Sequence, residues 1–332
     1  MTDDQARSNV RSYLPSSRPK DMIPPSGSGA GPRQFWRRIS AWDALWTVAA
    51  VHGRELRRSE VIDDSGFAAV ARALDAVRQP STDRPSRIRA ELAVMDERIE
   101  AMVPRSLSGA ATLGLSREEW LATGIRILWR DTALNVTGAL ADVADAALAL
   151  ADVHAVTVMP AFVGGRPAQP TTLAHYLGGL IGPLRANRER FVEGFARLNR
   201  SPLGAGILAG DVLAADREDV ADRLGFDGIV TNTFDALGSV EDIAELLAGV
   251  AAAAAILRRF VREIGLWVRT DPTSFVLDEG WTMLPEPGQP TLVLGERLDV
   301  LESLLGDVGT SAETLTHRLR QVSFGPAGSA YG

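Results

Sequence analysis

The chain has 332 residues, a formal net charge of −7 and a sequence pI near 5.3. This charge provides no basic footprint for nucleic acid or an anionic membrane, and no run of about eighteen apolar residues predicts a membrane span. Lys20 is the only lysine and there is no cysteine, which argues against Schiff-base chemistry and excludes disulfides, a thiolate nucleophile and a cysteine-bound metal. A cysteine-free chain fits a cytoplasmic protein.

The amino-terminal third predicts a tail and a small helical domain. Residues 1–33 are rich in Ser, Pro, Gly and charge, so they can bury little apolar surface and are expected to be disordered. Helical patterns follow at residues 36–54, at 67–77 behind an Asp63-Asp64-Ser65 cap signal, and at 87–102. We assign residues 34–110 to an amino-terminal helical domain.

Three long segments carry the strongest periodicity in the chain, at residues 118–154, 172–200 and 240–268. Their apolar residues recur at alternating steps of four and three, which is a heptad pattern. Each helix would be roughly 40–55 Å long, a length that suits a bundle. The prediction is an all-α fold, with a long-helix bundle over residues 111–308. The alanine run 251–255 either lets another helix approach closely, including one from another subunit, or only favours helix formation.

Loops and a weaker helical pattern at the carboxy terminus complete the predicted secondary structure. A Pro/Gly-rich turn leads into the second long helix, and a Gly-rich turn follows that helix at residues 201–210. Strand-like alternation is nearly absent. The last part predicts a loop over 273–290, helices over 291–305 and 311–321, and a flexible end, with residues 309–332 as a short carboxy-terminal tail.

Two turns resemble those of a known family. Asn199 and the Ser-Pro-Leu-Gly-Ala-Gly run at 201–206 resemble the Asn-x-Ser-Pro-Leu-Gly-x-Gly turn of the argininosuccinate lyase family, in the fumarase/aspartase superfamily. The loop containing Asn232 resembles the loop before that family's third long helix. The likeness runs from about residue 41 to 297, and the family's carboxy-terminal domain is expected to be absent. It implies the superfamily's helix bundle, in which loops from different subunits of a tetramer build sites that release fumarate.

The loop before the first long helix keeps part of the family's motif. Residues 114–119 resemble Gly-Arg-Ser-Arg-Asn-Asp, with Ser116 and Arg117 matched. The guanidinium of Arg117 could hold a substrate carboxylate with two hydrogen bonds. Glu118 stands where the family has a substrate-binding asparagine and is a candidate acid or base. The same residues also predict that Ser116 caps the helix and that the glutamates favour its amino end, and both interpretations can hold together.

The loop at residues 160–170 has lost the family's chemistry in two places. Val163 stands at the family's threonine and Gly164 at its catalytic-loop histidine. Gln169 matches a substrate-contacting glutamine. His175 matches a histidine that is not the catalytic one, and we interpret it as a satisfied packing residue.

The loop at residues 280–290 aligns with the superfamily signature Gly-Ser-Ser-x-Met-Pro-x-Lys-x-Asn-Pro. Trp281 stands at the catalytic serine, Pro287 at the lysine and Gln289 at the asparagine. The resemblance implies that Trp281, Thr282 and Gln289 line the substrate site. Glu286 is a second candidate acid or base, since a carboxyl buried against an indole has a raised pKa.

Two functions stay open. One is a repurposed lyase-type enzyme acting on a carboxylate-bearing, amino-acid-derived small molecule as a homotetramer, with no cofactor or metal. The other is a catalytically silent pseudoenzyme, structural or lending Ser116 and Arg117 to the shared site of an intact relative in a hetero-oligomer. Ordinary fumarate release would require the alignment of both altered loops to be wrong.

Overall fold

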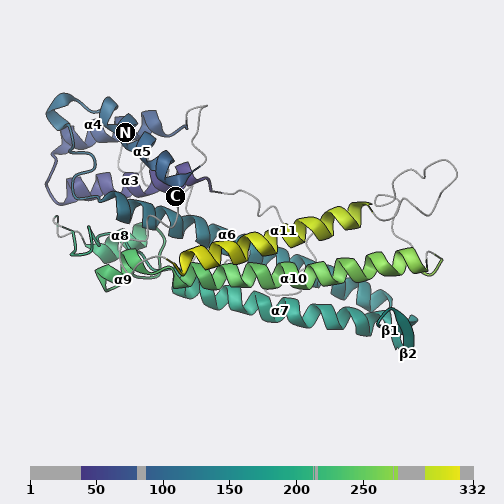
Figure 1. Ribbon diagram of the computed structural model, residues 1–332. Helices are drawn as coiled ribbons and strands as arrows, with labels where there is room; N and C mark the ends of the chain where they lie inside the picture. The colour runs from purple at the N-terminus through teal and green to yellow at the C-terminus, as the bar shows by residue number, and fades with distance from the viewer. Residues whose placement is uncertain are drawn as a thin grey trace, which may run out of the picture.

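The computed structural model describes residues 39–80, 87–211, 213, 216–271, 273–275 and 296–321. In this part of the chain a small helical domain lies at one end of a bundle of long helices (Figure 1). The predicted all-α helix bundle is confirmed. The predicted tail 1–33, the loop 280–290 and the flexible end 325–332 lie outside the described residues. The assignment of domain boundaries stays a prediction.

The small domain consists of α3 (Ala41–Arg58), α4 (Asp64–Val77) and α5 (Ile88–Met102). Helices α3 and α4 begin where the sequence supplies caps, because a side-chain oxygen satisfies backbone N–H groups that lack a partner inside the helix, whereas α5 begins after Arg87 without a side-chain cap. Ser40 forms a capping box with Asp43, and the Asp63 carboxylate accepts from the backbone N–H of Gly66 at 2.7 Å. The three predicted helices and the cap signal at Asp63 are therefore confirmed.

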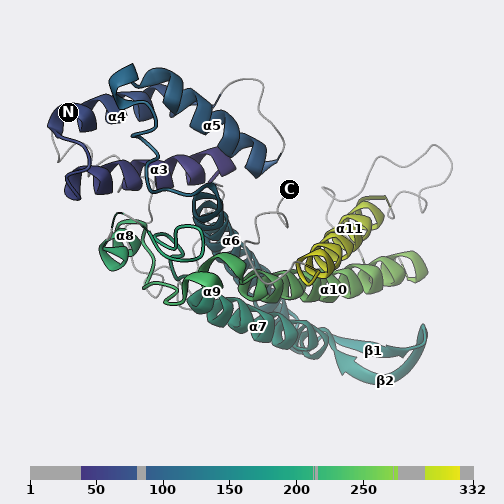
Figure 2. The same ribbon diagram turned by 60° about the vertical axis from the view of Figure 1, so that its left-hand side comes forward.

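The bundle contains α6 (Arg117–Val153), α7 (Leu173–Leu198), α10 (Glu241–Thr270) and α11 (Glu296–Leu319). Helix α7 packs against α6 and α10, and α11 lies along α10 (Figures 1 and 2). The 37 residues of α6 make it about 55 Å long. The three long predicted helices are confirmed. Among the described residues no helix is long and apolar enough to cross a membrane.

Helix α11 corrects the prediction of two separate carboxy-terminal helices. It is continuous through Gly306 and Gly309, which lie between the two predicted helices and have low helix propensity. A Cβ at Gly309 would lie 3.7 Å from the Cβ of Ala254, and one at Gly306 would lie 3.4 Å from the Arg258 guanidinium carbon. Both distances are ordinary van der Waals contacts, so the two glycines lie on the side of α11 that packs along α10, and this packing outweighs their low propensity.

A β-hairpin precedes α7, where the sequence predicted only a Pro/Gly-rich turn, and that prediction is wrong. Strand β1 (Val158–Val163) pairs antiparallel with β2 (Arg166–Thr172). Gly164 and Gly165 form the two-residue connection with φ of +56° and +76°. Such a connection needs positive φ at both positions, which glycine adopts without steric cost. Prolines at 160, 167 and 170 interrupt the alternation of apolar and polar residues by which strands are recognised in a sequence.

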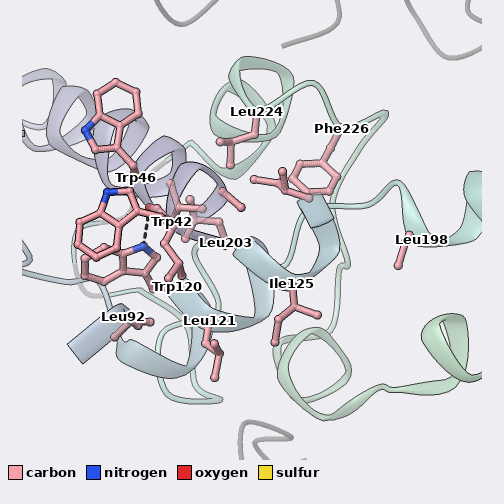
Figure 3. Close-up of a cluster of buried hydrophobic side chains, with 14 of the residues drawn as sticks. Trp42, Trp46, Leu92, Trp120, Leu121, Ile125, Leu198, Leu203, Leu224 and Phe226 are labelled. Carbon is pink, nitrogen blue, oxygen red and sulfur yellow. Dashed lines mark hydrogen bonds between the residues drawn. The ribbon is translucent and has the colours of Figure 1, made fainter. Parts of the chain in front are cut away.

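The core joins the small domain to the bundle around the first turns of α6 (Figure 3). The Trp120 indole is buried and its Nε1 donates to the Leu45 carbonyl oxygen at 2.8 Å. Trp42 and Trp46 of α3 likewise donate to carbonyls of α4. Buried indoles therefore have their N–H groups satisfied where three elements meet. This packing fixes the amino end of α6 relative to both parts of the molecule.

Candidate functional site

The amino end of α6 holds the Gly-rich turn in place. The Ser116 hydroxyl accepts from the Glu119 backbone N–H at 3.1 Å and donates to the Gly206 carbonyl oxygen at 2.6 Å. The Glu119 carboxylate accepts from the backbone N–H groups of Ser116, Gly204 and Gly206 at 2.8, 2.9 and 3.0 Å. The predicted helix cap at Ser116 is confirmed as a capping box. The sequence predicted only that Glu119 favours the amino end of the helix, and its hydrogen bonds to the Gly-rich turn were not predicted.

Glu119 is a buried carboxylate with only 1% of its surface exposed. Burial raises its pKa from 4.5 to about 7, because the cost of desolvating the anion outweighs the three backbone donors, and Asp211 adds a smaller repulsion. Its hydrogen bonds all go to the backbone of α6 and of the Gly-rich turn. Glu119 is therefore a structural clamp between these two segments.

Arg117 and Glu118 are both paired with residues of α5. The Arg117 guanidinium lies 2.7 Å from Asp96 Oδ2, with 67% of its side chain exposed. Arg89 forms an ion pair with Glu118 at 3.2 Å. Exposed ion pairs contribute little stability, so a ligand carboxylate could displace Asp96 at low cost. The negative charge of Glu118 is balanced by Arg89.

Asn232 lies at the same end of the bundle. It caps α9 (Thr233–Gly238), and its Oδ1 accepts from the backbone N–H groups of Phe234 and Asp235 at 2.9 and 3.2 Å. Helix α8 (Arg217–Arg223) lies nearby and covers the Gly-rich turn through Arg217, whose Nε donates to the Leu203 carbonyl oxygen at 3.0 Å. Asn232 thus has a structural role as a cap, beside its predicted contact with substrate.

Gln169 lies at the opposite end of the bundle, on β2. The length of α6, about 55 Å, separates it from Arg117 within one chain (Figure 1). The structure therefore brings together Ser116, Arg117, Glu118 and Asn232, and leaves Gln169 apart from them. The remaining predicted site residues lie outside the described residues: Trp281, Thr282, Glu286 and Gln289.

The hairpin, α7 and α10 enclose a pocket of about 980 Å³, which we call the hairpin pocket. Its polar lining includes Gln169, His175, Arg259 and Glu263, which come from β2, α7 and α10. Its apolar lining includes residues of β1, α7 and α10: Met159, Phe162, Tyr176, Leu180, Ile256, Phe260 and Trp267. A pocket with apolar walls and a few polar groups is the usual form of a small-molecule site.

The polar groups of the hairpin pocket are only partly satisfied by one another. The Tyr176 hydroxyl donates to Glu263 Oε2 at 2.8 Å, and burial together with this neighbour raises the pKa of the phenol, so Tyr176 is a neutral donor. His175 is exposed and its Nδ1 lies 2.9 Å from Thr171 Oγ1. The prediction that His175 is a satisfied packing residue is wrong about packing, because the side chain is exposed and its hydrogen-bond partner is a threonine at the surface.

Sequence reasoning missed Tyr176, Arg259, Glu263 and Trp267 as pocket residues. The last three share one side of α10, where a step of four residues separates each from the next. The heptad pattern concerns only the apolar positions of α10 and says nothing about the charged residues beside them. The signal that could have identified them is the pair of opposite charges flanked by aromatic residues.

Comparisons with known proteins identify the family to which this fold belongs. A family model described as Lyase matches residues 37–278. The argininosuccinate lyase of Oceanobacillus iheyensis is 30% identical over 291 residues, which are 83% of this chain and 62% of the relative. That of Ralstonia nicotianae is 30% identical over 284 residues, or 82% of this chain and 59% of the relative. The chain thus spans about three-fifths of the length of these relatives.

Two solved structures share the fold. An EDDS lyase in complex with formate superposes with a TM-score of 0.77 at 22% identity, over 92% of this chain and 64% of that one. The class II fumarase from Schistosoma mansoni superposes with a TM-score of 0.73 at 12% identity, over 98% and 74% respectively. At such identities the likeness establishes the fold, and the reaction has to be argued from residues.

Proposed function

The chain belongs to this lyase family, in the fumarase/aspartase superfamily, and from that premise we propose that it is a repurposed lyase-type enzyme. It acts on a carboxylate-bearing, amino-acid-derived small molecule in the cytoplasm, as a homo-oligomer. Its reaction differs from the family's fumarate release. Arg117 binds a substrate carboxylate, and Ser116 and Gln169 contribute polar contacts.

The main support is the backbone at Gly164 and Gly165. An elimination needs a base for the proton beside a carboxylate and donors for the developing charge. The position that the resemblance assigns to the histidine is the turn of a hairpin, where positive φ favours glycine. No imidazole or hydroxyl is available at residues 163 and 164. The proton acceptor of the proposed reaction must therefore be another group, with Glu118 and Glu286 as candidates.

The separation of Arg117 from the hairpin supports an assembled site. A single small molecule cannot contact both ends of α6, since they are about 55 Å apart. If both ends contribute to one site, then different copies of the chain must supply them. A tetramer with shared sites meets this requirement.

The first test is a turnover assay with argininosuccinate. We expect the purified protein to release no fumarate, measured by the ultraviolet absorbance of fumarate, while an argininosuccinate lyase assayed alongside it does. Fumarate release by the wild type that is abolished in Arg117→Ala would contradict the proposal, because it would demonstrate the standard reaction without the standard residues.

A catalytically silent partner subunit is the second candidate. It is favoured by the retained Ser116 and Arg117, which stand at a fully formed end of α6, opposite a hairpin without imidazole. The test is to mix this chain with an intact relative whose own Ser-Arg loop has been inactivated. Activity that is recovered with the wild-type chain, and is lost with Arg117→Ala, would favour this role over repurposed catalysis.

A further inference from the structure

Helix α10 carries four arginines among the described residues, and three of them face α11. Arg258 and Arg262 are paired with Glu302 at 3.5 and 2.6 Å, and Arg269 is paired with Asp299 at 3.1 Å. Arg259 follows Arg258 by one residue, so it points about 100° away around the helix. It lines the hairpin pocket, and within the described part of the chain it has no ion-pair partner.

Glu263 lies one helical turn after Arg259 and lines the same pocket. One of its oxygens accepts from the Tyr176 hydroxyl, and no cation of the described residues pairs with it. Residues four apart on a helix have Cβ atoms about 6 Å apart. The pocket therefore presents a guanidinium and a carboxylate side by side that are not paired with each other.

The wall next to these charges is aromatic. The ring centroids of Tyr176 and Trp267 are 4.5 Å apart, those of Phe162 and Trp267 are 5.7 Å apart, and Phe260 stacks on Tyr176. Trp267 is 2% exposed, and its indole N–H has no acceptor within the described residues. A buried donor without a partner is costly unless something in the site accepts from it.

We propose that the hairpin pocket binds the zwitterionic end of an α-amino acid that has an apolar or aromatic side chain. Arg259 holds the carboxylate with two hydrogen bonds, Glu263 holds the ammonium group, and the side chain lies against Tyr176, Phe260 and Trp267. The ammonium and the carboxylate of an α-amino acid are on one carbon, so the ligand can offer one charge to each of two residues that lie one helical turn apart. This inference rests on the proposed function and specifies its amino-acid-derived substrate class.

The test uses L-phenylalanine as the probe in isothermal titration calorimetry with the full chain. Two further probes each lack one charge: L-phenylalaninamide lacks the carboxylate and N-acetyl-L-phenylalanine lacks the ammonium. We expect each to bind the wild type about tenfold or more weakly than L-phenylalanine, as is typical when a charged hydrogen bond is lost. Equal binding of all three probes would overturn the assignment.

Protein variants assign each charge to its residue. Arg259→Gln should bind L-phenylalanine about tenfold more weakly and should no longer distinguish it from the amide. Glu263→Gln should no longer distinguish it from the N-acetyl derivative, and its amide oxygen can still accept from Tyr176. Arg258→Gln is the matched control, since that residue faces Glu302, and it should bind like the wild type. Loss of affinity in Arg258→Gln equal to that in Arg259→Gln would refute the proposal.

Trp267→Phe removes the unpartnered N–H and keeps an aromatic ring. A loss of affinity with unchanged helical circular dichroism supports an acceptor in the ligand, and unchanged affinity removes Trp267 from the site. Binding is measured without turnover, so failure of L-phenylalanine to bind overturns this inference. The proposed lyase reaction is tested separately, by the turnover assay with argininosuccinate. Tighter binding of L-arginine than of L-phenylalanine overturns the side-chain preference.

Discussion

At about pH 4.5, where the Glu119 carboxyl is protonated in the folded protein, replacing it by alanine is expected to lower the free energy of unfolding by about 3 kcal/mol, about 1 kcal/mol for each of the three backbone N–H groups that lose their acceptor. The Gly-rich turn should also lose its attachment to α6. Chemical denaturation followed by circular dichroism measures this change. Glu118→Ala is the matched control, because Glu118 is engaged in a partly exposed ion pair whose loss costs under about 1 kcal/mol. Equal losses in the two variants would contradict the assignment of a clamp to Glu119.

The same residue predicts a dependence of stability on pH. The folded-state pKa of Glu119, about 7, lies above its value of 4.5 in the unfolded chain. The contribution of Glu119 to the free energy of unfolding is therefore complete below about pH 4.5 and is lost as the pH rises through about 7. The change is up to about 3 kcal/mol. Glu119→Gln cannot ionise. The difference in unfolding free energy between wild type and this variant should shift against the wild type between about pH 4.5 and about pH 7, the interval between the two pKa values. A difference that does not change with pH would show that Glu119 has an ordinary pKa.

The second large effect is expected at Trp120. Trp120→Ala should lower the free energy of unfolding by about 3–5 kcal/mol, because it opens a cavity where α3 meets α6 and leaves the Leu45 carbonyl without its donor. Trp120→Phe should cost about 1–2 kcal/mol, mainly for the lost hydrogen bond. Leu148→Ala is the control on the same helix, since Leu148 is 51% exposed, and it should change stability by less than about 0.5 kcal/mol. A small effect of Trp120→Ala would mean that the two parts of the molecule are not joined there.

The helices were predictable because their signals are local. The heptad patterns of α6, α7 and α10 depend only on spacing, and Ser116 and Asp63 mark helix starts by side-chain chemistry alone. The hairpin was not predicted, because three prolines interrupt the alternation that identifies strands. The two glycines between the strands were the available signal, since such a pair is typical of a two-residue hairpin turn. The sequence predicted two helices where α11 is one, because its continuity depends on packing along α10, which the sequence does not reveal.

The candidate site was predictable only where a residue of the family's motif also has a local structural role. Ser116 caps α6 and also carries the family's motif, so one pattern led to both. The pairing of Arg117 with Asp96, and of Glu118 with Arg89, depends on how α5 lies beside α6. Likewise, Arg259 is distinguished from its neighbours only by the position of α11. These contacts join residues far apart in the sequence, and no local pattern encodes them.

The central claim concerns a lyase frame whose site is shared between copies and lacks the family's serine and histidine. An experimental structure of the assembled oligomer, soaked with argininosuccinate, tests it most directly. We expect Arg117 of one copy to face the hairpin of another across the ligand, with the Gly164-Gly165 turn at the position of the missing imidazole. A serine hydroxyl or histidine ring, from any copy, within hydrogen-bonding distance of the substrate's acidic carbon and supported by Arg117 would contradict the claim.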